Sequence, residues 1–318
     1  MGKGGQVTQG DALRSSGMPL EVMVARILPS LGMLPKGRYW YEDNATTYET
    51  DMLALGGWTS GPNSVEHAWF IECKQRQEDR YWCFFPQAEN VRDLSRNSFI
   101  FDVLEDRDGL NPSLLSGLER QVFPDLPIVG NGTQLSESKP GFWSANAEAI
   151  QNALRQTVLP IGHTLRWVFQ RNFILDYKGQ QIELYLPVVV TTARIFVLRP
   201  DVEWKQLSTF RAIDECFSAE PAVISAFTTP SYVERYWSDR ITFYLNEIRS
   251  RYPDVFSKRV FFQRLGKSQN EAVQHVASLL TRAMPTRVLI TEFDAFGSVL
   301  SKYRSAVDKA VAAILPRK

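Results

Sequence analysis

The chain has 318 residues, 44% of them hydrophobic and 22% charged, and its 36 lysines and arginines against 35 aspartates and glutamates give a net charge of +1. This composition is ordinary for a globular protein. The near-neutral total neither requires nor excludes a nucleic-acid partner, because a local basic groove can lie within a neutral surface. The sequence has no apolar run long enough to span a membrane and no signal-peptide pattern, so we expect a soluble, cytoplasmic protein that does not contact membranes.

Cysteines and histidines are few, and their spacing argues against a zinc site. Three of each occur, without the CxxC or HxxxH spacing of metal-binding motifs, so neither zinc nor a disulfide framework is expected. A metal ion in this chain would therefore be held by carboxylates, and oxygen ligands of that kind favour Mg²⁺ or Mn²⁺.

The N-terminal part of the sequence predicts a tail, a helix and a hairpin. Residues 1–16 are rich in glycine, glutamine and serine, as in a flexible tail. Leucine, valine and isoleucine then recur at helical spacing over 18–31, and Gly32 follows as a helix C-cap. Two short apolar runs, 50–55 and 67–74, flank a segment rich in glycine, proline and serine, which predicts a β-hairpin.

The next part of the sequence combines a short apolar run with a long polar segment. Residues 80–86 predict a third strand, or an approach to a helix around 86–96. From about 103 to 142 the chain is rich in aspartate, glycine, proline and serine, with only short apolar pieces. We expect this segment to be an insertion or a lid rather than part of the core.

The remaining sequence alternates helices and strands. Residues 144–170 predict a helix with a kink at Pro160. The continuous valine and isoleucine content of 180–199 predicts two adjacent strands, meeting near Thr191, in the buried centre of a sheet. The same patterns predict, in order, a strand at 221–230, helices at 231–250 and 268–283, a strand at 286–293 and a helix at 293–314.

Interleaved helices and strands place the protein in the α/β (α+β) class, with a central mixed sheet flanked by helices. The sequence shows no internal repeat. We expect the flexible tail over 1–16, a core over 17–200 that carries the insertion of 103–142, and a C-terminal α/β extension over 201–318 packed on that core.

Charged residues stand at the ends of the two hairpin strands. In a strand, residues i and i+2 face the same way, so Glu72 and Lys74 project side by side from the end of the second strand. Asp51 opens the first strand, and the hairpin would bring it next to them. Two carboxylates that bind divalent ions, with an ammonium that orients water or stabilises developing charge, are the groups needed for metal-assisted phosphodiester hydrolysis.

This arrangement resembles the motif of the PD-(D/E)xK nuclease superfamily, in which a lone acid starts one strand and (D/E)-x-K ends the next. The matching residues are Asp51 and Glu72-Cys73-Lys74, with Thr50 where the motif has proline. Within the superfamily, which has the restriction-endonuclease-like fold, the layout is most like the Mrr-type branch. The resemblance covers residues 17–100 well and 145–200 loosely.

The resemblance implies a Mg²⁺- or Mn²⁺-dependent nuclease that hydrolyses phosphodiester bonds in DNA, in bacterial restriction, phage defence or DNA processing. It also implies a glutamate on the first core helix that completes the metal shell, and Glu21 matches that position. Asp51, Glu72 and Glu21 are then the expected metal ligands. Together with Lys74, they are the expected catalytic residues.

Three polar residues after the motif are candidates for nucleic-acid contact: Gln75, Arg76 and Gln87. Both glutamines are also compatible with a plain surface role. The motif itself has a structural interpretation, because Glu72 and Lys74 could form an exposed ion pair of little energetic value.

Two other functions stay open from the sequence. The segments 103–142 and 201–318 favour a nuclease-fold scaffold or binding subunit of a larger nucleic-acid-processing complex, because added segments often mediate partner contacts. An RNase would use the same metal chemistry. The expected partners are DNA and, since the near-neutral chain leaves basic surface to be supplied elsewhere, a second copy of the chain or a partner protein subunit.

Overall fold

The computed structural model describes residues 18–43, 46–61, 63–76, 80–87, 101–106, 109–112, 123, 125–139, 142–174, 181–226, 231–258 and 268–314. The predicted tail over 1–16 lies outside these residues. The helix predicted around 86–96 also lies outside them, except for its first two positions.

The long predicted helices are present. The α-helices are α2 (Met18–Ile27), α4 (Glu148–Ile174), α5 (Trp204–Leu207), α6 (Ser231–Arg251), α7 (Pro253–Lys258), α9 (Gln269–Ala283) and α10 (Phe293–Ile314), and the 3₁₀ helices are η1 (Leu28–Leu31) and η3 (Ile213–Glu215). α4 continues through Pro160 as one helix. The predicted C-cap is confirmed, because η1 extends α2 and ends at Gly32, whose φ of 67° is left-handed.

The strands belong to two sheets. They are β1 (Leu34–Pro35), β2 (Tyr39–Asp43), β3 (Thr46–Thr50), β4 (Met52–Ser60), β5 (Asn63–Lys74), β6 (Arg80–Pro86), β7 (Phe101–Asp106), β8 (Gly109–Pro112), β9 (Ile128–Lys139), β10 (Phe142–Asn146), β11 (Gln181–Thr191), β12 (Arg194–Leu198), β13 (Phe217–Ala219), β14 (Ala222–Ala226) and β15 (Arg287–Glu292). β2 and β3 pair with each other, and the other strands form one large sheet.

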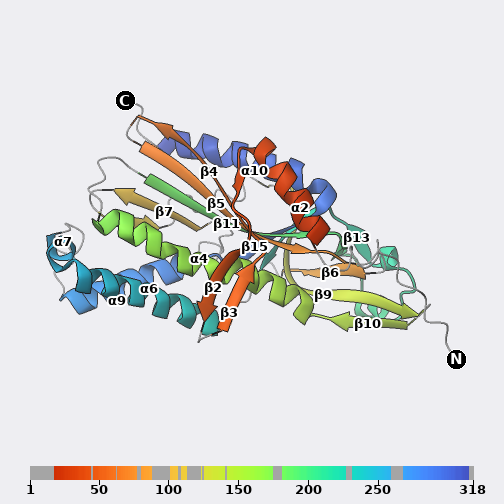
Figure 1. Cartoon of the computed structure of the whole chain (residues 1–318). Coiled ribbons are helices and arrows are strands. Elements are labelled where there is room, and N and C mark those ends of the chain that lie inside the picture. Colours follow the sequence, from red (N-terminus) through yellow and green to blue (C-terminus); the bar gives the residue numbers. More distant parts are fainter. Residues whose placement is uncertain are drawn as a thin grey trace.

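The large sheet is mixed, as the sequence predicts. Its main order is β1-β4-β5-β11-β15-β14-β9-β6-β12-β13 (Figure 1). The central strands β5, β11 and β15 are parallel to one another, whereas β4 and β14 run antiparallel to their central neighbours. Every residue of β11 is buried, which explains its continuous apolar run.

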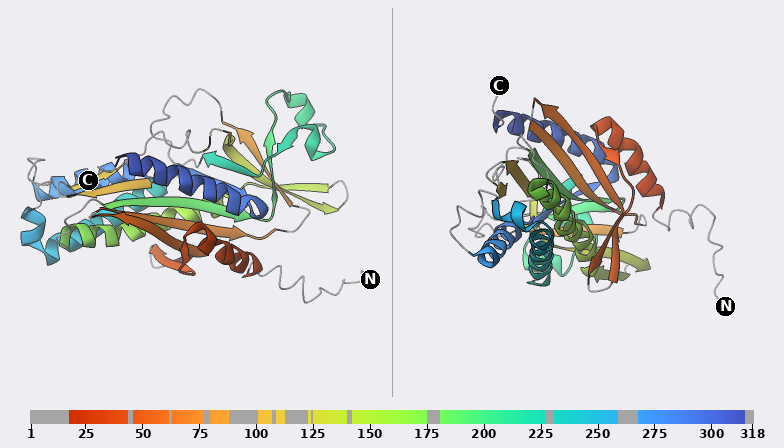
Figure 2. Two further views of the ribbon diagram at one scale, coloured as in Figure 1. Left: turned by 90° about the horizontal axis from the view of Figure 1, so that it is seen from above. Right: turned by 60° about the vertical axis from the view of Figure 1, so that its left-hand side comes forward.

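Helices cover both faces of this sheet, so the α/β class with a helix-flanked mixed sheet is confirmed. Ala68 and Phe70 of β5 belong to a buried cluster that includes α4, α6 and α9. The alternate residues Trp69 and Ile71 belong to a second cluster that includes α2 and α10. Figure 2 shows α10 on one side of the sheet and α4, α6 and α9 on the other. None of the described helices combines the length and apolar character needed to cross a membrane.

The prediction that 103–142 lies outside the core is wrong for β9, which lies inside the sheet between β14 and β6. Two of its residues break the apolar pattern by which a strand is recognised in the sequence. A Cβ added to Gly132 would lie 2.4 Å from the ring of Phe84, so the bare backbone makes room for that side chain. Gln134 is polar but buried, and its Oε1 accepts a hydrogen bond from Trp82 Nε1 at 3.3 Å. β9 therefore lacks the apolar alternation that marks a strand.

The C-terminal third of the chain contributes to the same sheet instead of packing on it. β14 and β15 lie between β11 and β9, with Val188 of β11 opposite Leu289 of β15. Both residues are fully buried. Strands that are apolar on both faces are most stable in the centre of a sheet whose two faces are covered. The domain boundary expected at residue 200 therefore does not separate two units, because strands from both sides of it pair in the same sheet.

Candidate functional site

The hairpin of β4 and β5 brings together the two acids that the sequence singles out. A tight turn at Gly61, whose φ is 58°, joins the strands, and their register runs from Ser60 opposite Asn63 to Met52 opposite Ile71. Continuing this register by one residue places Asp51 opposite Glu72. The two residues are in direct contact, because the Asp51 backbone N–H donates to Glu72 Oε2 at 3.4 Å.

A backbone hydrogen bond fixes the carboxylate of Asp51 at this end of the hairpin. The N–H of Cys73 donates to Asp51 Oδ2 at 2.8 Å. Asp51 lies at the bend between β3 and β4, where the chain passes from the two-stranded sheet to the large one. These contacts fix the position of Asp51 relative to the end of β5.

Lys74 completes the group and is held by a residue that sequence reasoning missed. Its Nζ donates to Glu72 Oε1 and, at 2.9 Å, to Gln156 Oε1. Gln156 belongs to α4, and its backbone oxygen also accepts a hydrogen bond from Thr50 Oγ1 at 2.6 Å. Nothing in the sequence near residue 156 marks this role, since the contact with Lys74 depends on how α4 packs on the sheet.

The environment of Glu72 makes its carboxylate unusual. Its side chain is 1% exposed. Burial, opposed by the charge of Lys74 and reinforced by that of Asp51, raises the pKa of Glu72 to about 7. A buried carboxylate beside a second one gains stability from a nearby cation, and Lys74 supplies one positive charge here.

Glu21 lies at the margin of this group. Burial and the charge of Asp51 raise the pKa of Glu21, whereas Arg38 lowers it. Arg38 Nη2 lies 3.6 Å from Glu21 Oε2, and Arg38 Nη1 lies 3.3 Å from Glu49 Oε1. The structure therefore brings Glu21 within electrostatic range of Asp51, but its ion-pair partner is Arg38.

The thiol of Cys73 lies within electrostatic range of all three carboxylates. Burial, followed by the charges of Asp51, Glu72 and Glu21, raises the pKa of Cys73 well above its usual value. Asp51 is the common neighbour, since its charge acts on both glutamates.

The three candidate nucleic-acid residues have different surroundings. Gln75 Oε1 is buried without a hydrogen-bond partner. The backbone N–H of Arg76 donates to Thr192 Oγ1 at 2.7 Å, and burial, with the nearby charge of Arg80, lowers the pKa of Arg76. Gln87 follows β6; its Oε1 accepts from Arg287 Nη2 at 3.5 Å, and no described contact joins it to Lys74.

The carboxylate pair fits a magnesium ion by its donor chemistry. Among the described residues, no group of three or more His, Cys, Asp or Glu side chains is arranged to hold a metal ion. Mg²⁺, however, is usually bound through one or two carboxylates and completes its shell with water and substrate phosphates. Asp51 and Glu72 offer two neighbouring carboxylates of this kind, and Glu72 is paired with Lys74 as Glu21 is with Arg38.

Comparison with known proteins finds no matching family model, no similar curated protein and no similar solved structure. The functional argument therefore depends on the geometry of the group formed by Asp51, Glu72 and Lys74.

Proposed function

We propose that the chain is a nuclease that hydrolyses phosphodiester bonds in DNA with Mg²⁺ or Mn²⁺. The observation that supports this proposal is the placement of Asp51 opposite Glu72 at the end of a hairpin, with Lys74 hydrogen-bonded beside them. The resemblance of the sequence motif to PD-(D/E)xK nucleases points to the same chemistry. A role in bacterial restriction, phage defence or DNA processing rests on that resemblance.

The two carboxylates and the ammonium would have separate roles. Asp51 and Glu72 would hold the cation, which when bound polarises the phosphate and lowers the pKa of a water molecule. The ammonium of Lys74, fixed by Gln156, stabilises the negative charge that develops on the phosphate oxygens. In the reaction the water gives up one proton to the solvent and its oxygen bonds to phosphorus, the P–O ester bond breaks, and the leaving oxygen takes up a proton.

Cleavage of defined substrates by the full chain tests this function. Supercoiled plasmid, linear duplex, single-stranded DNA and RNA are incubated with Mg²⁺ or Mn²⁺, and in parallel with EDTA. We expect DNA cleavage only with the metals, and a rate about 100-fold lower for Lys74→Met, because one charge-stabilising group is lost. Equal rates for the wild type and Lys74→Met would contradict the proposal, and cleavage of RNA alone would identify an RNase.

Gln156 is expected to act through Lys74. Gln156→Leu removes the acceptor that fixes the Lys74 ammonium, so kcat should fall about 10-fold or more while KM changes little. Gln156→Glu keeps an acceptor oxygen and should restore most of the rate. Asn152→Leu, one turn earlier on the exposed side of α4, is the matched control and should cleave like the wild type. A fall in kcat for Gln156→Leu that Gln156→Glu does not restore would indicate a merely structural role.

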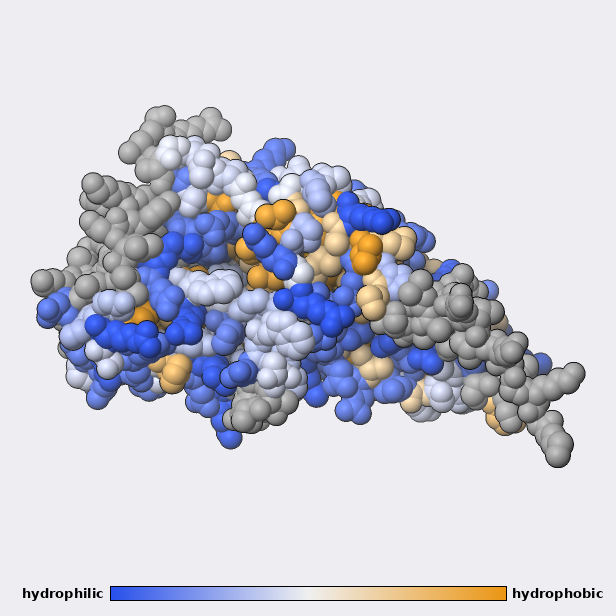
Figure 3. All heavy atoms as spheres, viewed as in Figure 1, coloured by the Kyte–Doolittle hydropathy of each residue, from blue (hydrophilic) through white to orange (hydrophobic). Residues whose placement is uncertain are grey.

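A binding subunit is the second candidate, because one helix exposes hydrophobic side chains. Met18, Val22 and Met23 of α2 are 45–55% exposed, and Figure 3 shows hydrophobic residues gathered in this region of the surface. Calorimetry with Mn²⁺ separates the two functions. Binding that is lost in Asp51→Asn supports the nuclease, and absence of binding at millimolar Mn²⁺ supports the scaffold.

A further inference from the structure

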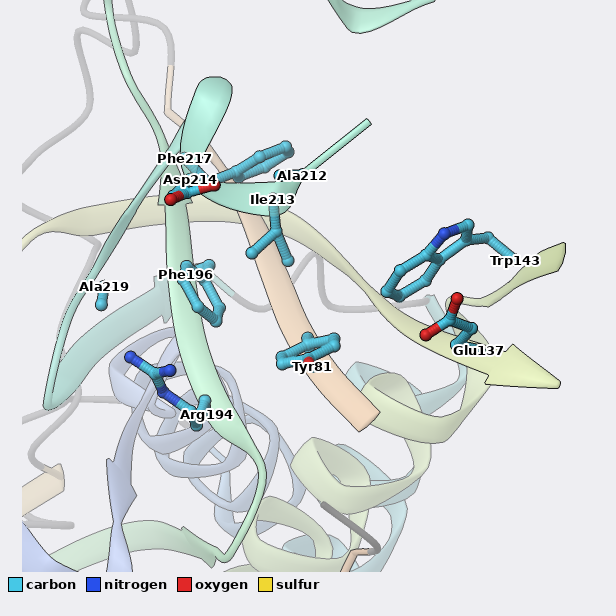
Figure 4. A pocket seen from close by; sticks show the side chains of 10 residues that line it. All are labelled: Tyr81, Glu137, Trp143, Arg194, Phe196, Ala212, Ile213, Asp214, Phe217 and Ala219. Carbon is cyan, nitrogen blue, oxygen red and sulfur yellow. The ribbon is translucent and has the colours of Figure 1, made fainter. Parts of the chain in front are cut away.

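A second site lies beyond the end of β5, where the large sheet continues as β6, β12 and β10. It is a pocket of about 460 Å³, a size usual for ligand sites. Its lining combines aromatic rings with charged groups, namely Tyr81, Trp143 and Phe196 with Glu137, Arg194 and Asp214 (Figure 4). None of these side chains belongs to the group around Asp51 and Glu72.

The pocket is close to the catalytic group along the strands. Thr191 of β11 stands opposite Lys74, and Arg194 of β12 stands opposite Tyr81. Thr192 lies between them, and its N–H donates to the backbone oxygen of Lys74 at 3.2 Å. Since residues 191 and 194 are three positions apart, their Cα atoms are separated by at most about 10 Å.

The two sites open on different faces of the sheet. Trp82 of β6 is part of the buried cluster that includes α4, on the side where Lys74 contacts Gln156. Its neighbour Tyr81 packs instead in a third, smaller cluster with Phe196. The pocket therefore lies on the face opposite to the catalytic group, and a ligand in it would not occupy the position of the scissile phosphate.

The aromatic rings offer surfaces for a flat ligand. The ring centroids of Tyr81 and Trp143 are 5.9 Å apart at an interplanar angle of 38°, and those of Tyr81 and Phe196 are 5.7 Å apart at 74°. Phe196 is buried, whereas Trp143 is 44% exposed. Trp143 is thus partly open to solvent where it lines the pocket, and Figure 4 shows its indole beside Tyr81.

The charged groups that line the pocket supply both hydrogen-bond acceptors and a donor beside these rings. Trp143 stands opposite Glu137 in the pairing of β10 with β9, and Asp214 lies across the pocket on η3. Arg194 Cζ lies 5.1 Å from the centroid of the Phe196 ring. Carboxylates accept from the amino groups of bases, and a guanidinium donates to base oxygen and nitrogen acceptors or to phosphate.

We propose that this pocket binds an unpaired nucleobase of the substrate strand. A nucleobase has a flat face that stacks on aromatic side chains and an edge that carries both donors and acceptors. A base within a duplex cannot enter such a pocket, so it comes from a single-stranded segment or is extruded from a duplex. The identity of the ligand as part of a substrate rests on the proposed nuclease function.

Binding without cleavage tests the pocket separately from the catalytic group. A single-stranded oligonucleotide containing 2-aminopurine is titrated with the full chain in EDTA, and anisotropy and 2-aminopurine fluorescence are followed. We expect quenching by the wild type, and affinity about tenfold lower or weaker still, with little quenching, for Trp143→Ala, as for the loss of one stacking ring. Arg194→Gln should also weaken binding. Trp204→Ala is the matched control, because Trp204 is 82% exposed and does not line the pocket.

The outcomes distinguish this proposal from the nuclease proposal. Affinity and quenching that are unchanged in both Trp143→Ala and Arg194→Gln, or no binding by the wild type, would overturn the pocket proposal even if the chain cleaves DNA. Binding that depends on Trp143 in a chain that never cleaves would retain the pocket and refute the nuclease. Quenching by a fully paired duplex indicates extrusion, and quenching limited to the single strand indicates a single-stranded source.

Discussion

Replacing Glu72 with glutamine is expected to reduce metal-dependent cleavage by about 10³-fold. It is also expected to shift the stability difference between variant and wild type in favour of the variant as the pH rises from 5 to 8. The first effect follows from the loss of one of two metal-binding carboxylates. The second follows from burial, because Glu72 is 1% exposed and its pKa is raised to about 7. Glutamine keeps the shape of the side chain without the buried charge.

The direction of the pH effect follows from the two pKa values. In the unfolded chain Glu72 titrates near the usual glutamate value of about 4.3, so above that pH the unfolded chain loses its proton before the folded chain does. The stability contribution of protonated Glu72 is fully present below the unfolded pKa and is lost as the pH rises through about 7. Between pH 5 and pH 8 the wild type should therefore lose about 2–3 kcal/mol relative to Glu72→Gln.

Urea denaturation at pH 5 and pH 8 measures this difference directly. Glu66→Gln is the matched control, because Glu66 lies on the same strand but is exposed and pairs with Arg171 at 3.5 Å. It should change stability by less than about 1 kcal/mol at either pH and should not affect cleavage. If Glu72→Gln lowered stability equally at both pH values and still cleaved DNA, Glu72 would be a structural residue.

The local part of the candidate site could be predicted from the sequence, and the remote part could not. Glu72 and Lys74 end one strand of a hairpin and Asp51 directly precedes the other, so strand alternation and hairpin pairing are enough to bring them together. Gln156 reaches Lys74 from a helix 82 residues away. Its position depends on packing of the whole sheet, which no local pattern contains.

The same difference between local and long-range information explains the fold. The helices have clear periodicity and the buried strand β11 has a continuous apolar run, and the structure confirms these elements. The sequence does not reveal β9, because Gly132 and Gln134 stand where apolar residues would be expected. The ring of Phe84 occupies the space beside Gly132, and Trp82 donates a hydrogen bond to Gln134. The insertion of β14 and β15 between β11 and β9 is a long-range pairing, and such pairings depend on which buried surfaces match rather than on neighbouring sequence.

Asp308 is expected to have a large effect on stability although it lies away from the site. Asp308 Oδ1 lies 2.8 Å from His67 Nε2 and accepts a hydrogen bond from Trp58 Nε1 at 2.9 Å. Arg304 Nε donates to its Oδ2 at 3.3 Å. Asp308 therefore ties α10 to both strands of the hairpin that carries the candidate site.

Replacing Asp308 with alanine removes the acceptor for three groups at once, of which His67 is buried. The ring of His67 is fully buried, so its Nε2 would lose its partner without gaining access to water. We expect the free energy of unfolding to fall by about 2–4 kcal/mol at pH 7. Chemical denaturation measures this loss. Lys309→Ala, at the exposed neighbouring position, should stay within about 0.5 kcal/mol of the wild type.

The contribution of Asp308 should also depend on pH, in the direction opposite to that of Glu72. Burial acts to raise its pKa, but the hydrogen bond and charge of His67, with Trp58 and Arg304, outweigh burial and lower it. Its stability contribution is therefore present above the unfolded pKa and is lost as the pH falls through the folded pKa, so the cost of Asp308→Ala should shrink in acid. A cost that stayed constant from pH 7 to pH 3 would show that the carboxylate charge does not hold α10 to the hairpin.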